Sequence, residues 1–247
     1  MILEERPDMA QAFVEAAWNA QERKHPYNPK SAGVTTLIGC LLKAYYQRTG
    51  QLLEAPDTQS MLTLLLGTNG HAVLGKAGDE EDVPISWAMY SAEDDRFEKE
   101  MEITGYVDFM DGGVPCELKT TSMAPGKISD TYVEQLAAYC WMLGVNAGRL
   151  YVVHNTGFKK AVRCYTFGFT NDELAAWGTE LIRRLTKLVE SVEDWDRSPF
   201  TAEYWEDILR PEHHEWQCKY CGAKGTLCPG GPGRDAHWFE AAKRLGT

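Results

Sequence analysis

The sequence contains no apolar run as long as a membrane span, and its first residues lack the pattern of a signal peptide. It also has no internal repeat and no low-complexity segment. These absences predict a cytoplasmic protein without a membrane partner, located in the host cytoplasm if a virus encodes it. With 247 residues, 44% apolar and 25% charged, the chain has enough apolar side chains to form a core of its own.

A basic excess is lacking as well, because the net charge is −11. The acidic excess is concentrated between Asp79 and Glu102, where ten acidic and two basic residues together contribute −8. The rest of the chain is therefore close to neutral. A nucleic acid would have to bind through a local basic surface, since the overall field repels phosphate.

Seven cysteines in a cytoplasmic chain are not expected to form disulfides. Three of them fall within predicted strands or helices, where a free cysteine is usually a small buried apolar residue. These three are Cys116, Cys140 and Cys164. The other four are Cys40, far upstream, and Cys218, Cys221 and Cys228, which include a C-x2-C pair. Thiols at this spacing are typical of metal sites.

Hydrophobic periodicity and capping residues predict an α/β fold with a mixed central sheet flanked by helices. Helices are expected over 7–20, 35–50, 59–74, 131–143 and from 171 to about 192, and strands over 97–103, 104–110, 114–120, 149–155 and 161–169. Capping-box patterns begin at Thr131 and at Thr170, and Gly144 suits a helix end. We expect a single domain, 1–247, with a helical part (1–78), an acidic insert and first strand (79–102), a core (103–192) and a cysteine region (193–247).

The most informative stretch is a predicted hairpin that contains Asp108 in its first strand and Glu117 and Lys119 in its second. The turn between the strands is expected at Asp111-Gly112-Gly113. Because residues two apart on a strand face the same way, Glu117 and Lys119 share one face, and hairpin pairing brings Asp108 near them. Two carboxylates and an ammonium suit a hard divalent cation and a phosphate. The simpler alternative is a solvated hairpin with an exposed Glu-Lys pair.

The order of these residues resembles the PD-(D/E)XK nuclease superfamily, which has the restriction-endonuclease-like fold. Within it, the chain is most similar to RecB-like exonucleases with an iron–sulfur cluster, including the CRISPR-associated "Cas-four" family and its viral relatives. The resemblance covers about residues 34–230. The matching positions are His71, Asp108, the E-x-K motif Glu117-Leu118-Lys119, the Q-x-x-x-Y motif Gln135 and Tyr139, and the cluster cysteines Cys40, Cys218, Cys221 and Cys228.

The resemblance implies a metal-dependent DNA exonuclease that acts on single strands or DNA ends. By this analogy His71, Asp108, Glu117 and the Leu118 carbonyl hold Mg²⁺ or Mn²⁺, and Lys119 orients the attacking water. Gln135 and Tyr139 would hold the DNA strand or the lysine. The four cysteines would hold a [4Fe–4S] cluster that ties the Cys40 helix to the C-terminal tail.

Several alternatives remain open at this stage. Structural zinc would suit the late cysteines with His213, His214 or His237, although a local zinc site would not need Cys40. We expect these three histidines to lie at the surface. A catalytically silent module that binds DNA ends or assembles a complex, and a zinc-stapled regulatory domain, are the alternative functions. The resemblance suggests CRISPR adaptation or recombination proteins as partners, and an oligomer is compatible with the sequence.

Overall fold

The structure is a computed structural model of the whole chain. It describes residues 11–12, 14–17, 28–52, 61, 65, 76, 78–93, 96–121, 128–156, 159–198, 202–210, 214, 217–218, 221, 223–224, 227–228 and 243–246. The predicted helices over 7–20 and 59–74 lie mostly outside these residues. His71, His213 and His237 lie outside them entirely.

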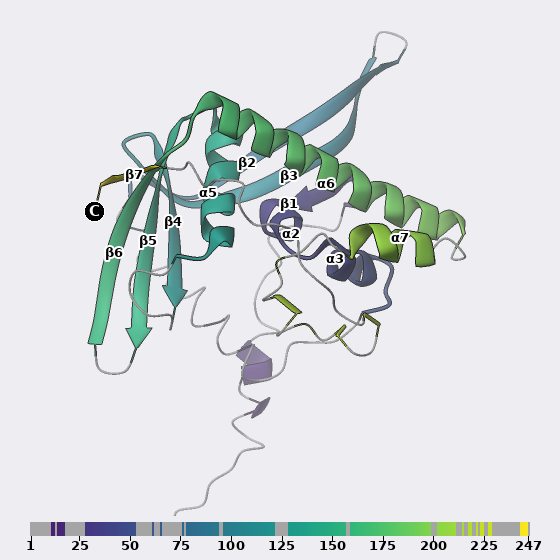
Figure 1. Cartoon of the computed structure of the whole chain (residues 1–247), viewed down its shortest axis with the longest axis horizontal. Coiled ribbons are helices and arrows are strands. Elements are labelled where there is room, and N and C mark those ends of the chain that lie inside the picture. Colours follow the sequence, from purple (N-terminus) through teal and green to yellow (C-terminus); the bar gives the residue numbers. More distant parts are fainter. Residues whose placement is uncertain are drawn as a thin grey trace, which may run out of the picture.

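The fold is α/β, with a mixed sheet flanked by helices (Figure 1). The strands within the described residues are β1 (Ser31–Gly33), β2 (Glu80–Glu93), β3 (Arg96–Asp111), β4 (Val114–Thr121), β5 (Ala147–Thr156), β6 (Lys159–Gly168) and β7 (Lys243–Gly246). The helices are α2 (Val34–Ile38), α3 (Leu41–Arg48), α5 (Asp130–Leu143), α6 (Asn171–Arg197) and α7 (Ala202–Leu209). Strands β1, β2 and β7 and helix α7 were not predicted from the sequence.

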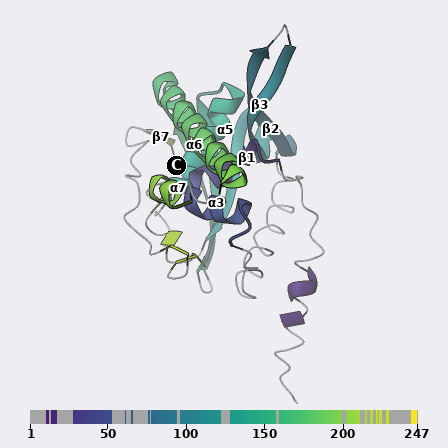
Figure 2. The same cartoon turned by 90° about the vertical axis from the view of Figure 1, so that its right-hand side faces the viewer.

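The strands follow the order β1-β3-β4-β5-β6-β7, and β2 pairs with β3. Both β1–β3 and β4–β5 are parallel, whereas the other pairs are antiparallel. Helix α5 joins β4 to β5, as a parallel connection requires. It packs on the sheet, and α6 packs on α5 (Figure 2). Within the described residues, no helix has the length and apolar character needed to cross a bilayer.

Strand β3 has different partners on its two edges. Phe109 pairs with Glu81 of β2 and with Cys116 of β4, so β2 and β4 lie on opposite edges. Ile103 pairs with both β2 and β1, so β1 shares the edge of β4. The β3–β4 ladder ends at Phe109 and Cys116, and β4 then continues beside β5 only. Strands β3 and β4 therefore separate just beyond this pair.

The acidic segment corrects one expectation. We predicted an insert that leads into two separate strands over 97–103 and 104–110. Instead β3 is one strand across Gly105, and most of the insert forms β2, which pairs with it along nearly its whole length. The resulting long hairpin projects beyond the rest of the sheet (Figures 1 and 2). Continuous pairing with β2 holds Gly105 in a strand, where glycine alone would weaken it.

Local turn and capping signals were mostly correct. Gly112 and Gly113 both have positive φ and join β3 to β4, and Gly144 ends α5 in the left-handed region at φ 68°. Thr170 and Glu173 form a capping box at the start of α6. The box predicted at Thr131 is wrong, because α5 begins after Ser129 and has no side-chain cap hydrogen bond there.

The helix predicted over 35–50 is broken into α2 and α3 at Gly39 and Cys40. Cys40 is therefore the N-cap of α3, and its Sγ accepts a hydrogen bond from the Lys43 N–H at 3.5 Å. The fully buried Arg184 of α6 donates to the carbonyl oxygens of Leu37 and Gly39. These carbonyls lie at the end of α2 and lack helical partners, so Arg184 compensates for the break.

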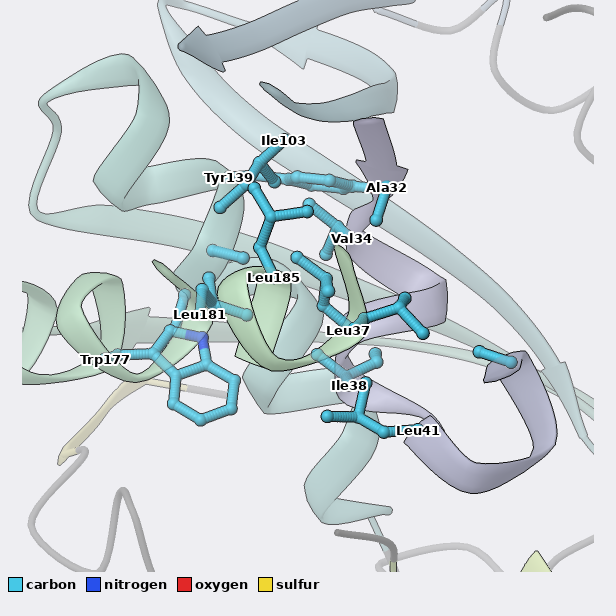
Figure 3. Close-up of a cluster of buried hydrophobic side chains, with 14 of the residues drawn as sticks. Ala32, Val34, Leu37, Ile38, Leu41, Ile103, Tyr139, Trp177, Leu181 and Leu185 are labelled. Atoms are coloured by element: carbon cyan, nitrogen blue, oxygen red, sulfur yellow. The ribbon is translucent and has the colours of Figure 1, made fainter. Parts of the chain in front are cut away.

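The main core lies between α2, α5, α6 and the sheet (Figure 3). Leu37 and Leu41 of the α2–α3 segment face Trp177, Leu181 and Leu185 of α6. All five side chains are fully buried. The periodic apolar residues that predicted the helix after Thr170 are buried as a stripe that packs on α5 and the α2–α3 segment. They are Leu174, Trp177, Leu181, Leu185, Leu188 and Val192.

We expect Gly178→Ala to destabilise the fold, because a Cβ at this position would overlap the Trp141 indole of α5. Such overpacking costs about 1–3 kcal/mol, which should lower Tm by roughly 3–10 °C. Thr179→Ala is the matched control, since Thr179 is exposed on the same helix. Thermal unfolding followed by circular dichroism measures both. An unchanged Tm for Gly178→Ala would contradict the close α5–α6 packing.

Candidate active site and cysteine cavity

The predicted carboxylates and lysine come together where β3 and β4 separate. Leu118 has lost its possible ladder partner on β3, and its N–H donates instead to Asp108 Oδ2 at 2.7 Å. Lys119 Nζ forms an ion pair with Glu117 Oε1. The end of the ladder thus lets the Asp108 side chain reach the backbone of the E-x-K segment.

Strand alternation places Glu117 and Lys119 on one face, as predicted. The opposite face of β4 carries Cys116 and Leu118, which pack with Phe109 in a separate small apolar cluster. Glu117 pairs in register with Leu150, which is buried on the face that α5 covers. The Glu117 side chain is only 1% exposed. The carboxylate is therefore held in a region of low water content beneath α5.

The pKa of Lys119 is set by opposing effects. Burial lowers it, but the charge of Glu117 and its hydrogen bond, with smaller contributions from Asp108 and Tyr132, raise it above the ordinary lysine value. Lys119 is accordingly a protonated donor at neutral pH. Its Nζ also lies 5.6 Å from the centroid of the Tyr132 ring, an arrangement that stabilises an ammonium.

Gln135 and Tyr139 of α5 lie against the same site. Gln135 Nε2 donates to the Tyr139 hydroxyl at 2.7 Å, and both side chains are buried. Tyr139 approaches β3 closely at Gly105, where a Cβ would come within 2.9 Å of the ring. Burial raises the pKa of Tyr139 well above its ordinary value, and the charges of Glu117 and Asp108 raise it further. The tyrosine is therefore a neutral hydroxyl beside two carboxylates.

Tyr132 was not identified from the sequence as a site residue. The sequence does contain a pattern that could have identified Tyr132, because Tyr132, Gln135 and Tyr139 have the i, i+3, i+7 spacing of one helical face. The three residues thus reach the E-x-K face of the sheet from one side of α5.

The four predicted cluster cysteines also come together. Cys40, Cys218, Cys221 and Cys228 all line one cavity of about 370 Å³ between the α2–α3 segment and the C-terminal segment. The C-terminal wall is held by hydrogen bonds: Cys228 N–H donates to the Ala223 carbonyl at 2.8 Å, and the Tyr46 hydroxyl donates to the Leu227 carbonyl at 3.0 Å. Residues far apart in the chain thus share one cavity.

Burial raises the pKa of the Cys40 thiol to about 11, and the neighbouring Cys221 and Cys218 raise it as well. Hydrogen bonds from the backbone of Lys43 and Leu42 act in the opposite direction. Cys40 is therefore a protonated thiol at neutral pH, and binding of a metal group would release its proton. Lys43, Arg210 and Lys224, which also line the cavity, would offset the negative charge of thiolates.

In neither site do the described side chains already have the arrangement of a metal-binding site. Over the described part of the chain, no three His, Cys, Asp or Glu side chains already form one. The donor chemistry nevertheless fits the expected groups, with carboxylate oxygens for a hard cation at one site and four thiols for iron or zinc at the other. The expected ligand His71 is not among the described residues.

Comparison with solved structures shows proteins of similar fold. The crystal structure of SSO0001 superposes with a TM-score of 0.55 and 18% sequence identity, over 93% of this chain and 98% of that chain. No family model and no curated protein matches the sequence. At this identity the likeness shows the fold alone, and the function must be argued from the site.

Proposed function

We propose that this protein is a metal-dependent DNA nuclease of the PD-(D/E)XK type, a RecB-like exonuclease with the restriction-endonuclease-like fold. One observation carries the proposal: Asp108, Glu117 and Lys119 converge where β3 and β4 part, and the Asp108 carboxylate bonds the Leu118 N–H of the E-x-K segment. A solvated hairpin would leave Glu117 exposed, whereas this carboxylate is buried beneath α5.

In the proposed site Asp108 and Glu117 hold Mg²⁺ or Mn²⁺, together with the Leu118 carbonyl and His71 as the resemblance implies. A bound divalent ion supplies Lewis acidity, which lowers the pKa of water and offsets phosphate charge. The ammonium of Lys119 donates to the attacking water or to a phosphate oxygen and leaves its ion pair with Glu117. Tyr132 keeps the ammonium close to the carboxylates, and the buried Tyr139 excludes bulk water.

The cysteine cavity is proposed to hold a [4Fe–4S] cluster through Cys40, Cys218, Cys221 and Cys228. Its contribution is structural, because the cavity joins the α2–α3 segment to the C-terminal segment. The position of Cys40 in the same cavity as the three late cysteines supports this proposal over a local zinc knuckle, which would use only neighbouring residues.

End-labelled single- and double-stranded DNA, incubated with Mn²⁺ or Mg²⁺, tests the activity. We expect the wild-type protein to shorten single strands from an end, and EDTA to stop the reaction. Circular single-stranded DNA is the control for the need for an end. If the metal-loaded protein binds DNA but leaves it intact, the chain is a DNA-end-binding module rather than a nuclease.

A further inference from the structure

A buried hydrogen bond joins the C-terminal segment, which contains Cys218, Cys221 and Cys228, to helix α5, which covers the candidate active site. His214 Nε2 lies 2.8 Å from Glu134 Oε2, and the residues are 3% and 0% exposed. We had expected His214 at the surface as one of three C-terminal histidines, and that expectation is wrong. The pair connects residues 80 positions apart, so it holds this part of the C-terminal segment against α5.

At one end, His214 is tied to the cysteine cavity by two hydrogen bonds with Gln217. Its N–H donates to Gln217 Oε1 at 3.1 Å, and the Gln217 N–H donates to the His214 carbonyl at 2.9 Å. Gln217 and the next residue, Cys218, both line the cavity. A shift of Cys218 would therefore be passed to His214 through Gln217 and its two hydrogen bonds.

At the other end, Glu134 directly precedes Gln135 of the candidate active site. The Trp177 indole N–H of α6 donates to the Glu134 carbonyl at 3.0 Å, so both backbone and side chain of Glu134 are held. Gln135 in turn donates to Tyr139, whose hydroxyl senses the charges of Glu117 and Asp108. The links from the cavity to Tyr139 are therefore hydrogen bonds or neighbouring positions on α5, and the charges of Glu117 and Asp108 act on the Tyr139 hydroxyl.

Breaking this link would be costly. A buried carboxylate or imidazole that loses its hydrogen-bond partner is destabilised by its desolvation free energy, because no water replaces the partner. Glu134 and His214 therefore either move together or become exposed when the local structure opens. Coupling of this kind is reciprocal, because whatever stabilises one end stabilises the other by the same free energy.

We propose that the His214–Glu134 hydrogen bond couples occupancy of the cysteine cavity to the position of α5, and thereby to Gln135 and Tyr139 beside Glu117. His214 and Glu134 are positioning residues in this scheme. The inference rests on the proposed function for the metal group in the cavity and for the activity of the site. The coupling itself can be measured without any DNA cleavage.

Hydrogen–deuterium exchange of the 130–143 amides tests the coupling, in the purified protein before and after iron and zinc are stripped with dithionite and a chelator. In the wild type, we expect stripping to raise exchange in α5 by at least about tenfold, or about 1.4 kcal/mol. In Glu134→Gln and His214→Phe, exchange in α5 should already be raised and should change little on stripping. Thr170→Ala is the control, because it weakens the capping box of α6 without touching the link, and it should respond like the wild type.

Unchanged protection of α5 on stripping of the wild type would overturn the inference, and so would a Glu134→Gln variant that responds fully. A protein that is purified with neither iron nor zinc would overturn it too. If a single variant does not fold, Glu134→Leu/His214→Leu replaces it, because an apolar pair leaves no buried charge.

Should exchange in α5 respond to stripping while the wild type cuts no DNA, the coupling stands and the nuclease proposal fails. The converse result keeps the nuclease and removes the coupling.

In an active protein, the variants also separate positioning from simple destabilisation. We expect Glu134→Gln to lower kcat by more than it changes KM at a temperature where it is fully folded, since Gln135 and Tyr139 shift beside Glu117 while the other groups of the site stay in place. Equal activity of Glu134→Gln and wild type under these conditions would contradict the positioning role.

Discussion

Replacement of Glu117 by Gln is expected to abolish cleavage of single-stranded DNA, with a loss of at least about a hundredfold. The variant keeps the volume of the side chain and an oxygen that can accept from Lys119, but it removes the negative charge that would hold the divalent ion. Initial rates on end-labelled DNA over a range of Mn²⁺ concentrations measure the effect. Glu80→Gln is the matched control, because Glu80 is an exposed carboxylate in the same sheet.

Lys119→Met should cause a loss of similar size, since it keeps most of the apolar stem and removes the ammonium. It also leaves Glu117 buried without its ion-pair partner, so some loss of stability is expected. The double variant Glu117→Gln/Lys119→Met removes both charges and should recover stability but not activity. If the folded Lys119→Met variant cuts at the wild-type rate, Lys119 has no catalytic role.

The second large effect is expected at the cysteine cavity. If the cavity holds an iron–sulfur cluster, anaerobically purified protein should be brown. Cys221→Ser should remove this colour and most of the soluble folded protein, because a ligand to the group that joins the two segments is lost. Loss of a direct ligand should weaken retention of the metal by more than the roughly 10–100-fold that outer contacts contribute. Visible absorption, iron and zinc analysis and thermal unfolding measure these effects.

Cys164→Ser is the control for Cys221→Ser, because Cys164 is half-buried on β6 and does not line the cavity. It should keep both colour and stability. The metal content of Cys40→Ser distinguishes the two metals, because an iron–sulfur cluster needs this distant ligand, whereas a local zinc site does not. A colourless, zinc-loaded wild type, or a Cys40→Ser variant with unchanged metal content, would defeat the cluster proposal.

Much of the secondary structure and the core of the site were predictable because their signals are short-range. Alternation along β4 placed Glu117 and Lys119 on one face, and the two glycines at 112 and 113 marked the turn. The i, i+4 spacing brought Gln135 to Tyr139. Each of these depends on strand or helix periodicity or on backbone freedom, which a few neighbouring residues determine.

Other features could not be predicted because they depend on partners far along the chain. The break at Gly39 and Cys40 is compensated by Arg184. Glu134, the fourth residue of the capping box predicted at Thr131, bonds His214 instead. The acidic segment became a strand because β3 offered it a long edge. In each case the local pattern was compatible with more than one structure, and a distant partner selected among them.

The sequence by itself determined which chemical groups this protein carries and which of them share a strand or a helical face. Only the tertiary structure decided that the β3–β4 ladder ends where Asp108 can bond the E-x-K backbone, and that four thiols from distant parts of the chain line one cavity. The physical reason is that side-chain periodicity is a property of a few consecutive residues. Packing between distant segments depends on the free energy of the whole core, which no local pattern contains.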